Sequence, residues 1–336
     1  MRRLIGLVVV LALLYGGYWA VGAQAVRRGA AAALEQARAE GWGSAEAVTL
    51  AGFPSRFDLT LHAPEVRDPQ GSLAWRADLA QVFALSYRPQ ELIVFTPTTQ
   101  QLRLGGQWFD LTNSDLRASA AVGLAASLPL SRGTLVGKDL ALAHGTTPVL
   151  AASELRAAIR QAQTDPAPNA YDLGLDLLQL DLPRHWLARI APQTDLPARI
   201  ERLHVDATAT LSAPLDRTAP AAPPQIEALS LHAAELDWGG RQLRADGTLS
   251  IGPAGQPEGT ITFRSKDWQS WLALAEDLGL IAAKQMPMLT GLGTYMAQAQ
   301  GGELAVPLAF QNGRMSLGPV PLGPASVTIT LSPAQS

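Results

Sequence analysis

One stretch decides the fold class: Trp75-Arg76-Ala77-Asp78-Leu79-Ala80-Gln81-Val82-Phe83-Ala84-Leu85, in which large apolar side chains occupy most odd-numbered positions. A spacing of two is the period of a β-strand that buries one face. The same alternation returns at residues 57–61 and 205–211, and Pro and Gly turn signals separate the runs. The chain is therefore predicted to be mainly β (α+β), with many short antiparallel strands.

Hairpin signals refine this prediction toward the C-terminus. Asn312-Gly313 separates two alternating runs and supplies the left-handed positions of a tight turn, and Gly239-Gly240 is a second candidate. Pro307 has no N–H to donate, so its strand is expected at a sheet edge or a bulge. The segment 148–163 favours a helix by composition, but its apolar residues alternate, which favours a strand.

A second helical region is predicted near the C-terminus. Residues 267–300 form a helical hairpin in this interpretation, since Trp268, Trp271, Leu272 and Ala275 recur every three or four positions. Asp267 is expected to cap its start. The break at Met286-Pro287 divides the stretch into two helices.

The domain organisation follows from the breaks in these patterns. A Pro-rich linker at 214–224 separates a first β section, 46–213, from a second, 225–336. A connecting helix is expected at 24–45, after the N-terminal segment.

The N-terminus predicts a membrane segment. Residues 1–3 carry two arginines as a cytoplasmic n-region, and Leu4 to Ala23 has no charge. A helix of about 20 residues spans roughly 30 Å, the thickness of the hydrocarbon core. A cleaved signal is the open alternative, because Ala23-Gln24-Ala25 is an A-x-A site and cleavage near Ala25 would release the chain. Both interpretations place the bulk of the chain in the periplasm of a bacterium.

Composition excludes several classes of function. The 336 residues include 26 Lys+Arg and 29 Asp+Glu, a net charge of −3, so a basic nucleic-acid-binding face is not expected. The absence of cysteine excludes disulfides, thiolate nucleophiles and Cys-ligated zinc.

Candidate catalytic groups form no recognisable motif. The five histidines, of which His62, His204 and His232 lie in strand-like runs, have no metal-ligand spacing, and no nucleotide loop or nucleophile elbow occurs. Asp172 and Asp176 have the even spacing of one strand face, which a solvated face also produces. We therefore expect no enzyme, cofactor or metal site, and keep one alternative, a hydrolase with a pocket near His185 or Asp181.

One motif stands above this background: Gly52-Phe53-Pro54-Ser55-Arg56-Phe57-Asp58-Leu59. Gly52 permits a tight bend, Pro54 fixes its own φ, and Phe53 and Phe57 can close the end of a sheet. Arg56 and Asp58 are expected on the strand face opposite Phe57, and a structural corner is the plain interpretation.

These residues resemble the signature of an uncharacterised alphaproteobacterial family, the domain of unknown function 2125 family. Tyr87-Arg88-Pro89-Gln90 is similar to its Tyr-x-Pro-Asn step, with Gln90 as the departure, and residues 313–323 resemble its ending. That family has no assigned catalytic residues, so the resemblance implies none.

Strands such as 247–251 and 259–263 are more distantly similar to those of AsmA-type envelope proteins. That resemblance implies an inner-membrane anchor followed by an elongated, curved antiparallel sheet with an apolar groove for lipid chains. The expected function is envelope maintenance by binding or shielding phospholipid acyl chains, with the inner membrane and other envelope proteins as partners. A non-enzymatic scaffold or adaptor is the alternative.

Overall fold

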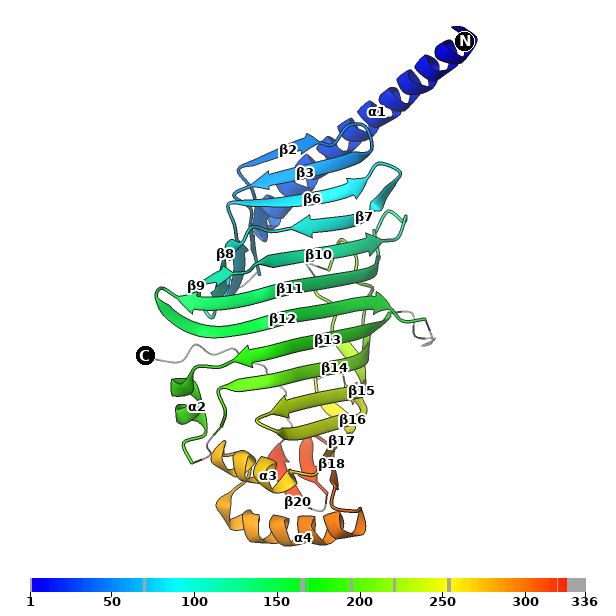
Figure 1. The fold of residues 1–336 in the computed structure, drawn as a ribbon. Helices are drawn as coiled ribbons and strands as arrows, with labels where there is room; N and C mark the ends of the chain where they lie inside the picture. Colours follow the sequence, from blue (N-terminus) through cyan, green and yellow to red (C-terminus); the bar gives the residue numbers. More distant parts are fainter. Residues whose placement is uncertain are drawn as a thin grey trace. The chain divides into compact units, whose positions relative to one another are not determined.

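The computed structural model describes residues 2–68, 71–163, 167, 169–193, 196–219, 222–252, 255–318 and 320–324. Over these residues the chain is mostly antiparallel β-sheet with an apolar N-terminal helix, as predicted (Figure 1). Two compact units form. Among the described residues, unit 1 contains those up to Leu135 together with 216–219, 222 and Pro223, and unit 2 contains those from Val136 to Leu215 and from Pro224 to Pro324.

The units divide the chain along a different line from the predicted sections. The boundary between them falls inside strand β11 (Leu130–His144) rather than at 214–224. The two predicted sections therefore stay a prediction, and residues 325–336 of the second lie outside the described residues.

Helix α1 (Arg2–Glu40) runs unbroken through the predicted anchor and most of the predicted connecting helix. Alanine-rich sequence after residue 29 sustains it, because alanine has the highest intrinsic helix propensity. Its portion Ile5–Glu40 is the one described helix that is long and apolar enough to cross a membrane, with a mean hydropathy of 1.9 in its most apolar window. An N-terminal anchor and a signal sequence both have this property.

Unit 1 contains two antiparallel ladders. The first runs through β2 (Ala47–Ala51), β3 (Arg56–His62), β6 (Leu79–Leu85), β7 (Arg88–Phe95) and β10 (Asp115–Val122). The second runs through β1 (Gly43–Ser44), β4 (Glu65–Arg67), β5 (Leu73–Arg76), β8 (Thr99–Leu104) and β9 (Gln107–Thr112). Strands of the two ladders follow each other in the chain after short breaks, so the chain passes repeatedly from one ladder to the other.

Buried polar side chains form hydrogen bonds where the chain passes from one ladder to the other. Gln100 is 2 % exposed; its amide nitrogen donates to Thr96 Oγ1 and the Pro97 carbonyl, and its oxygen accepts from Trp75 Nε1. Asn113 also donates to the Pro97 carbonyl at 3.1 Å. These bonds satisfy backbone carbonyls that would otherwise lack partners where the ladder is interrupted.

Unit 2 is an antiparallel meander in which each strand pairs with the next. It contains β12 (Thr147–Gln161), β13 (Ala170–Asp181), β14 (Arg199–Leu211), β15 (Ile226–Trp238), β16 (Arg241–Ile251), β17 (Pro257–Ser265), β18 (Leu304–Gln311), β19 (Arg314–Leu317) and β20 (Val320–Pro324). Both predicted hairpins form, with Gln311 opposite Arg314 and Trp238 opposite Arg241. The strand predicted at 148–163 is β12.

Pro307 corrects the edge-strand prediction. Strand β18 is an interior strand that pairs with both β17 and β19. The Pro307 carbonyl oxygen accepts a hydrogen bond from the N–H of Gly318, the residue that follows β19. In an antiparallel strand the carbonyl and the nitrogen of one residue face the same neighbouring strand, so the missing N–H of Pro307 lies on the β19 side of β18. The strand tolerates proline because β19 pairing begins only at Leu308.

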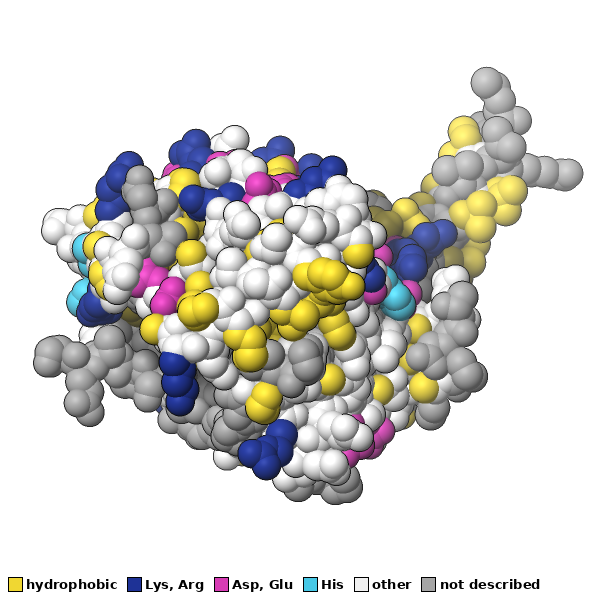
Figure 2. All heavy atoms as spheres, turned by 90° about the horizontal axis from the view of Figure 1, so that it is seen from below, with side chains coloured by type: hydrophobic (Ala, Val, Ile, Leu, Met, Phe, Trp, Pro, Cys, Tyr) yellow, Lys and Arg dark blue, Asp and Glu magenta, His cyan; other side chains and the backbone are white. Residues whose placement is uncertain are grey.

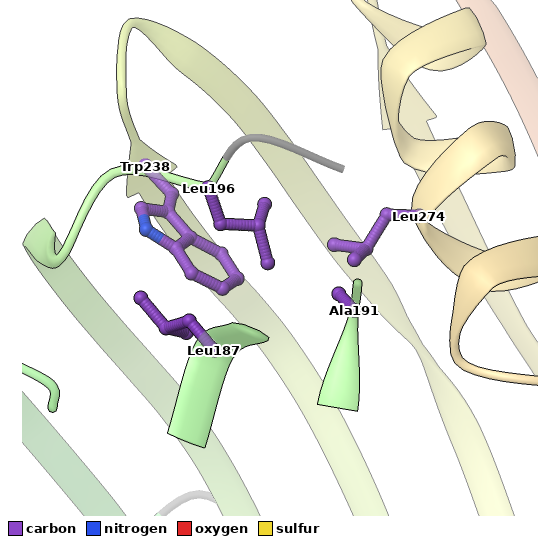
Figure 3. Close-up of a cluster of buried hydrophobic side chains, with 5 residues drawn as sticks. All are labelled: Leu187, Ala191, Leu196, Trp238 and Leu274. Carbon is purple, nitrogen blue, oxygen red and sulfur yellow. The ribbon is translucent and has the colours of Figure 1, made fainter. Parts of the chain in front are cut away.

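In the part of unit 2 that the structure describes, the helices beside the sheet are α2 (Arg184–Ile190), α3 (Trp268–Asp277), η1 (Ala283–Gln285) and α4 (Met286–Ala299). Pro287 lies in the first turn of α4, where its missing N–H costs little. Asp267 occupies the N-cap position of α3, but its side chain makes no capping hydrogen bond, which corrects the predicted cap. A core of Leu187, Ala191, Leu196, Trp238 and Leu274 packs α2 and α3 against the sheet (Figure 3).

Candidate functional site

The sheet of unit 2 has one apolar face, because apolar residues at alternate positions align in register across neighbouring strands. Two rows define what we call the apolar face: Leu155, Leu177, Leu203, Leu236 and Leu243, and Ile159, Leu173, Ala207, Leu231, Gly247, Ile261, Leu308 and Leu317. Cross-strand neighbours on one face stand about 5 Å apart, so each row is a continuous apolar strip. The leucines of these rows are half-buried. The face therefore offers more apolar surface than the described residues cover.

The opposite face of the same strands is polar. Asp176 accepts hydrogen bonds from Arg202 and lies 3.0 Å from His204 Nδ1, and Asp172 accepts from Arg160 and Thr208. Burial alone raises the pKa of Asp176, but the hydrogen bonds from Arg202 and His204 outweigh burial and hold that pKa below its usual value. Ionised carboxylates that pair with arginine in this way are typical of a sheet face exposed to water.

A cavity lies between the helices and the sheet at one end of the apolar face. Its volume is about 220 Å³, and its lining is almost entirely hydrocarbon from β16 to β19, α3 and α4. The lining includes Leu243, Phe263, Trp268, Trp271, Leu272, Ala275, Leu289, Leu292, Met296, Leu304 and Val306. An engineered apolar cavity of about 150 Å³ stays dry and binds benzene, so a site of this size can hold an apolar group.

The helix sequences explain how this cavity forms. Trp268, Trp271, Leu272 and Ala275 line up on one side of α3, at the spacing expected for a face turned toward a core. Gly293 lets α4 approach closely, since a Cβ there would lie 2.8 Å from the Trp268 ring. Trp271 Nε1 is buried without a hydrogen-bond partner among the described residues, although the residue lines the cavity.

The outer surface of the helices is also apolar. Leu278, Leu280, Met288 and Tyr295 are exposed, Leu280 by 68 % and Tyr295 by 74 %. The view from below shows hydrophobic side chains gathered together, with charged side chains of both signs around them (Figure 2). An exposed apolar patch with a polar rim is typical of an interaction surface.

The sequence motif at 52–58 lies in unit 1, against α1. Phe57 is 5 % exposed and faces the helix, while Arg56 and Asp58 form an ion pair on the other side of β3. Gly52 has a φ of 104°, and a Cβ there would lie 2.8 Å from the Arg56 carbonyl oxygen, so the turn requires glycine. Phe53 contacts Trp19 edge-on but remains 63 % exposed, so only Phe57 closes the sheet end.

The residues considered for hydrolysis do not converge. His185 is exposed on α2 beside Trp186, and Asp181 is engaged by both Nε and Nη2 of Arg199. Asp172 and Asp176 are four residues apart on one strand, about 13 Å, which is too far for a carboxylate pair that shares a substrate. Among the described residues no group of three or more His, Asp or Glu side chains could hold a metal ion.

A family model described as uncharacterized protein conserved in bacteria (DUF2125) matches residues 19–326. The chain belongs to this family. The match confirms the resemblance drawn from residues 52–59. It includes α1 from Trp19 onward and residues of both units of this DUF2125 chain. No curated protein and no solved structure matches the chain. The relation of this DUF2125 chain to AsmA-type proteins stays a prediction.

Sequence reasoning singled out the motif at 52–58 but not the cavity of unit 2. The side of α3 that lines the cavity carries Trp268, Trp271, Leu272 and Ala275. In the sequence their spacing predicts a helix but no cavity. The walls from β16 to β19 come from strands with no distinctive residues, and their register brings them together.

Proposed function

We propose that this chain is an inner-membrane protein, anchored by α1 with its bulk in the periplasm, that binds lipid acyl chains. The acyl chain lies on the apolar face of unit 2, a curved groove of the AsmA kind, with one end in the cavity beneath α3 and α4, which pack as a helical hairpin. The cavity carries this proposal, because its described lining is almost entirely hydrocarbon, with Arg264 and Ser265 as the polar exceptions. An enzyme site requires positioned polar groups, whereas acyl binding requires apolar surface.

The energetics favour an acyl ligand. Each CH₂ that leaves water contributes about 0.8 kcal/mol, so a few methylene groups in the cavity give measurable affinity. A ligand that accepts a hydrogen bond from Trp271 Nε1 would bind better, because a buried donor without an acceptor costs about 1–3 kcal/mol of stability. The carbonyl oxygen of an acyl ester or a fatty acid supplies an acceptor.

A matched pair of variants on α3 tests the proposal. Ala275 lines the cavity and Ala273 is exposed two residues away, so Ala275→Phe fills the cavity while Ala273→Phe adds the same ring to the surface. The full chain is purified in mild detergent, and bound phospholipid and fatty acid are measured by native mass spectrometry. We expect lipid bound to the unmodified chain and to A273F, and a loss of at least about tenfold in A275F, since about 1.4 kcal/mol of lost burial gives that factor.

Circular dichroism and thermal unfolding show that A275F is folded, and Met296→Trp is a second cavity-filling variant with Gln298→Trp as its exposed control. Equal lipid in all variants, or no lipid in the unmodified chain, would contradict acyl binding at this site.

The exposed patch of Leu278, Leu280, Met288 and Tyr295 favours a second candidate, an envelope adaptor that docks a partner protein. Under this candidate, Leu280→Asp with Tyr295→Asp abolishes co-purification of a specific envelope protein and leaves bound lipid unchanged. Loss of lipid without loss of a partner supports acyl binding instead.

A further inference from the structure

Helix α1 contacts unit 1 well before its apolar segment ends. Tyr15 Oη lies 3.3 Å from Ser86 Oγ, and Tyr18 Oη donates to the Ser86 carbonyl at 2.8 Å. Trp19 Nε1 donates to the Arg56 carbonyl at 2.9 Å. One turn later Gly22 touches the Phe57 ring, where a Cβ would lie 2.8 Å from Cζ. The ends of β3 and β6 are thus fixed to residues 15–22 of the apolar helix.

The length of free helix is too short to span a bilayer alone. From Leu4 to the residue before Tyr15 there are about 11 residues, or about 16 Å of helix, against roughly 30 Å of hydrocarbon. The span is completed only when residues 15–23 also enter the membrane. Any turn that is fixed to these residues must then lie at the depth of the membrane surface or below it.

The turns at this position have the side chains that a membrane surface selects. Phe53, in the β2–β3 turn, is 63 % exposed, and Tyr87, in the β6–β7 turn, is 65 % exposed. The side chains of Arg56 and Arg88 beside them are 55 % and 60 % exposed, although each also pairs with a carboxylate, Asp58 at 3.1 Å and Glu91 at 3.7 Å. Aromatic rings concentrate at the membrane–water interface, and guanidinium groups bind phosphate oxygens.

We propose that the β2–β3 and β6–β7 turns insert into the lipid headgroup region around α1, with Phe53 and Tyr87 as wedges and Arg56 and Arg88 on lipid phosphates. We call Tyr15, Tyr18, Trp19, Phe53 and Tyr87 the aromatic collar. The collar fixes the depth and tilt of unit 1 at the membrane. This proposal rests on the anchor role of α1 in the proposed function, and not on the cavity of unit 2.

Single thiols test the collar, because the chain contains no cysteine. Phe53→Cys and Tyr87→Cys carry an environment-sensitive fluorophore in the full chain, reconstituted in phosphatidylethanolamine–phosphatidylglycerol vesicles. Val9→Cys in α1 reports the anchor, and Gln107→Cys, an exposed position at the start of β9 in unit 1, is the control. Spin-labelled lipid with the label near the headgroup is the quencher.

We expect blue-shifted, quenched emission at positions 53 and 87 and neither effect at position 107. If the labels at positions 53 and 87 show the same emission as the label at 107, while the label at position 9 is protected from water, the collar is overturned and the anchor stands. Position 9 exposed to water would overturn the collar together with the anchor. Equal quenching at position 107 would also overturn the collar, since lipid contact would not be specific to the turns.

Discussion

Units 1 and 2 are both antiparallel sheets, but they use apolar surface in opposite ways. In the ladders of unit 1, from β1 to β10, no strand exceeds eight residues. Buried polar side chains such as Gln100 form hydrogen bonds between these short strands. In unit 2, β12 to β16 have 11 to 15 residues, and apolar rows continue across them in register.

The way each unit covers its sheet differs as well. Unit 1 buries small residues of α1 itself, Ala23 and Ala37, and Ala45 just after β1, each 3 % exposed. Unit 2 leaves leucines of the apolar face half-buried and encloses a cavity beneath α3 and α4. Unit 1 therefore uses its apolar side chains to pack α1 against its strands, whereas unit 2 keeps the apolar surface on which the proposed function depends.

The largest expected loss of stability comes from a substitution that disturbs the strand pairing of unit 2. Gly247 has a φ of 153°, and a Cβ there would lie 2.1 Å from the Thr260 carbonyl oxygen on β17. Gly247→Ala should lower the free energy of unfolding by about 3 kcal/mol, because backbone must move to admit the methyl group. Gly174→Ala on β13 is the control, since a Cβ there meets nothing within 4 Å.

Thermal unfolding followed by circular dichroism measures both glycine variants. Hydrogen exchange by mass spectrometry assigns the loss to a unit, and we expect it in β16 and β17. Equal stability of G247A and G174A would show that the close approach of these strands does not constrain the sheet.

An intermediate effect is expected at an interruption of unit 1. Gln100→Ala removes the acceptor of Trp75 Nε1 and the donor to Thr96 and Pro97, so it should cost about 2 kcal/mol. Gln101→Ala should cost much less, because Gln101 is half-buried and water can replace its bonds to Arg76 and Asp110. Hydrogen exchange of peptides from β5 and β8 is the measurement. A loss in Q101A as large as in Q100A would contradict the structural role of the buried amide.

The smallest effect concerns the polar face of unit 2. The pKa of Asp176 is held below its usual value in the folded chain, so the unfolded chain binds more protons near pH 4. The stabilisation is complete above the unfolded pKa of about 3.9 and is lost as the pH falls through the folded value. Asp176→Asn should therefore lower stability at pH 7 by about 0.5 kcal/mol, after solvent screening, and flatten the decline below pH 4.

Unfolding at pH 7 and pH 3 measures this effect, with Asp206→Asn, an exposed position on the same face, as control. An acid-induced loss of the same size in D176N and the unmodified chain would show that this carboxylate does not contribute to it.

Local pattern predicted much of this fold. Alternation identified several strands, including β12, but the run Trp75–Leu85 is two strands, β5 and β6, which belong to different ladders. The glycine pairs at 239–240 and 312–313 identified two hairpins, because turn chemistry is a property of adjacent residues. The uncharged run predicted the apolar part of α1.

Features set by distant residues were not predicted. Pro307 sits in an interior strand because β19 begins pairing one residue later, which no local rule reports. The contact between Tyr18 and Ser86 joins positions 68 residues apart, and the cavity depends on the register of β16 to β19 with two helices. Such features require the three-dimensional pairing of strands.

Acyl binding by unit 2 is tested most directly by photolabelling. The full chain is incubated in vesicles with a phospholipid that carries a diazirine in its acyl chain, irradiated, and digested for peptide mapping. We predict adducts on peptides covering Trp268–Asp277 and Met286–Ala299, in addition to those of α1. Adducts on α1 alone would contradict the account.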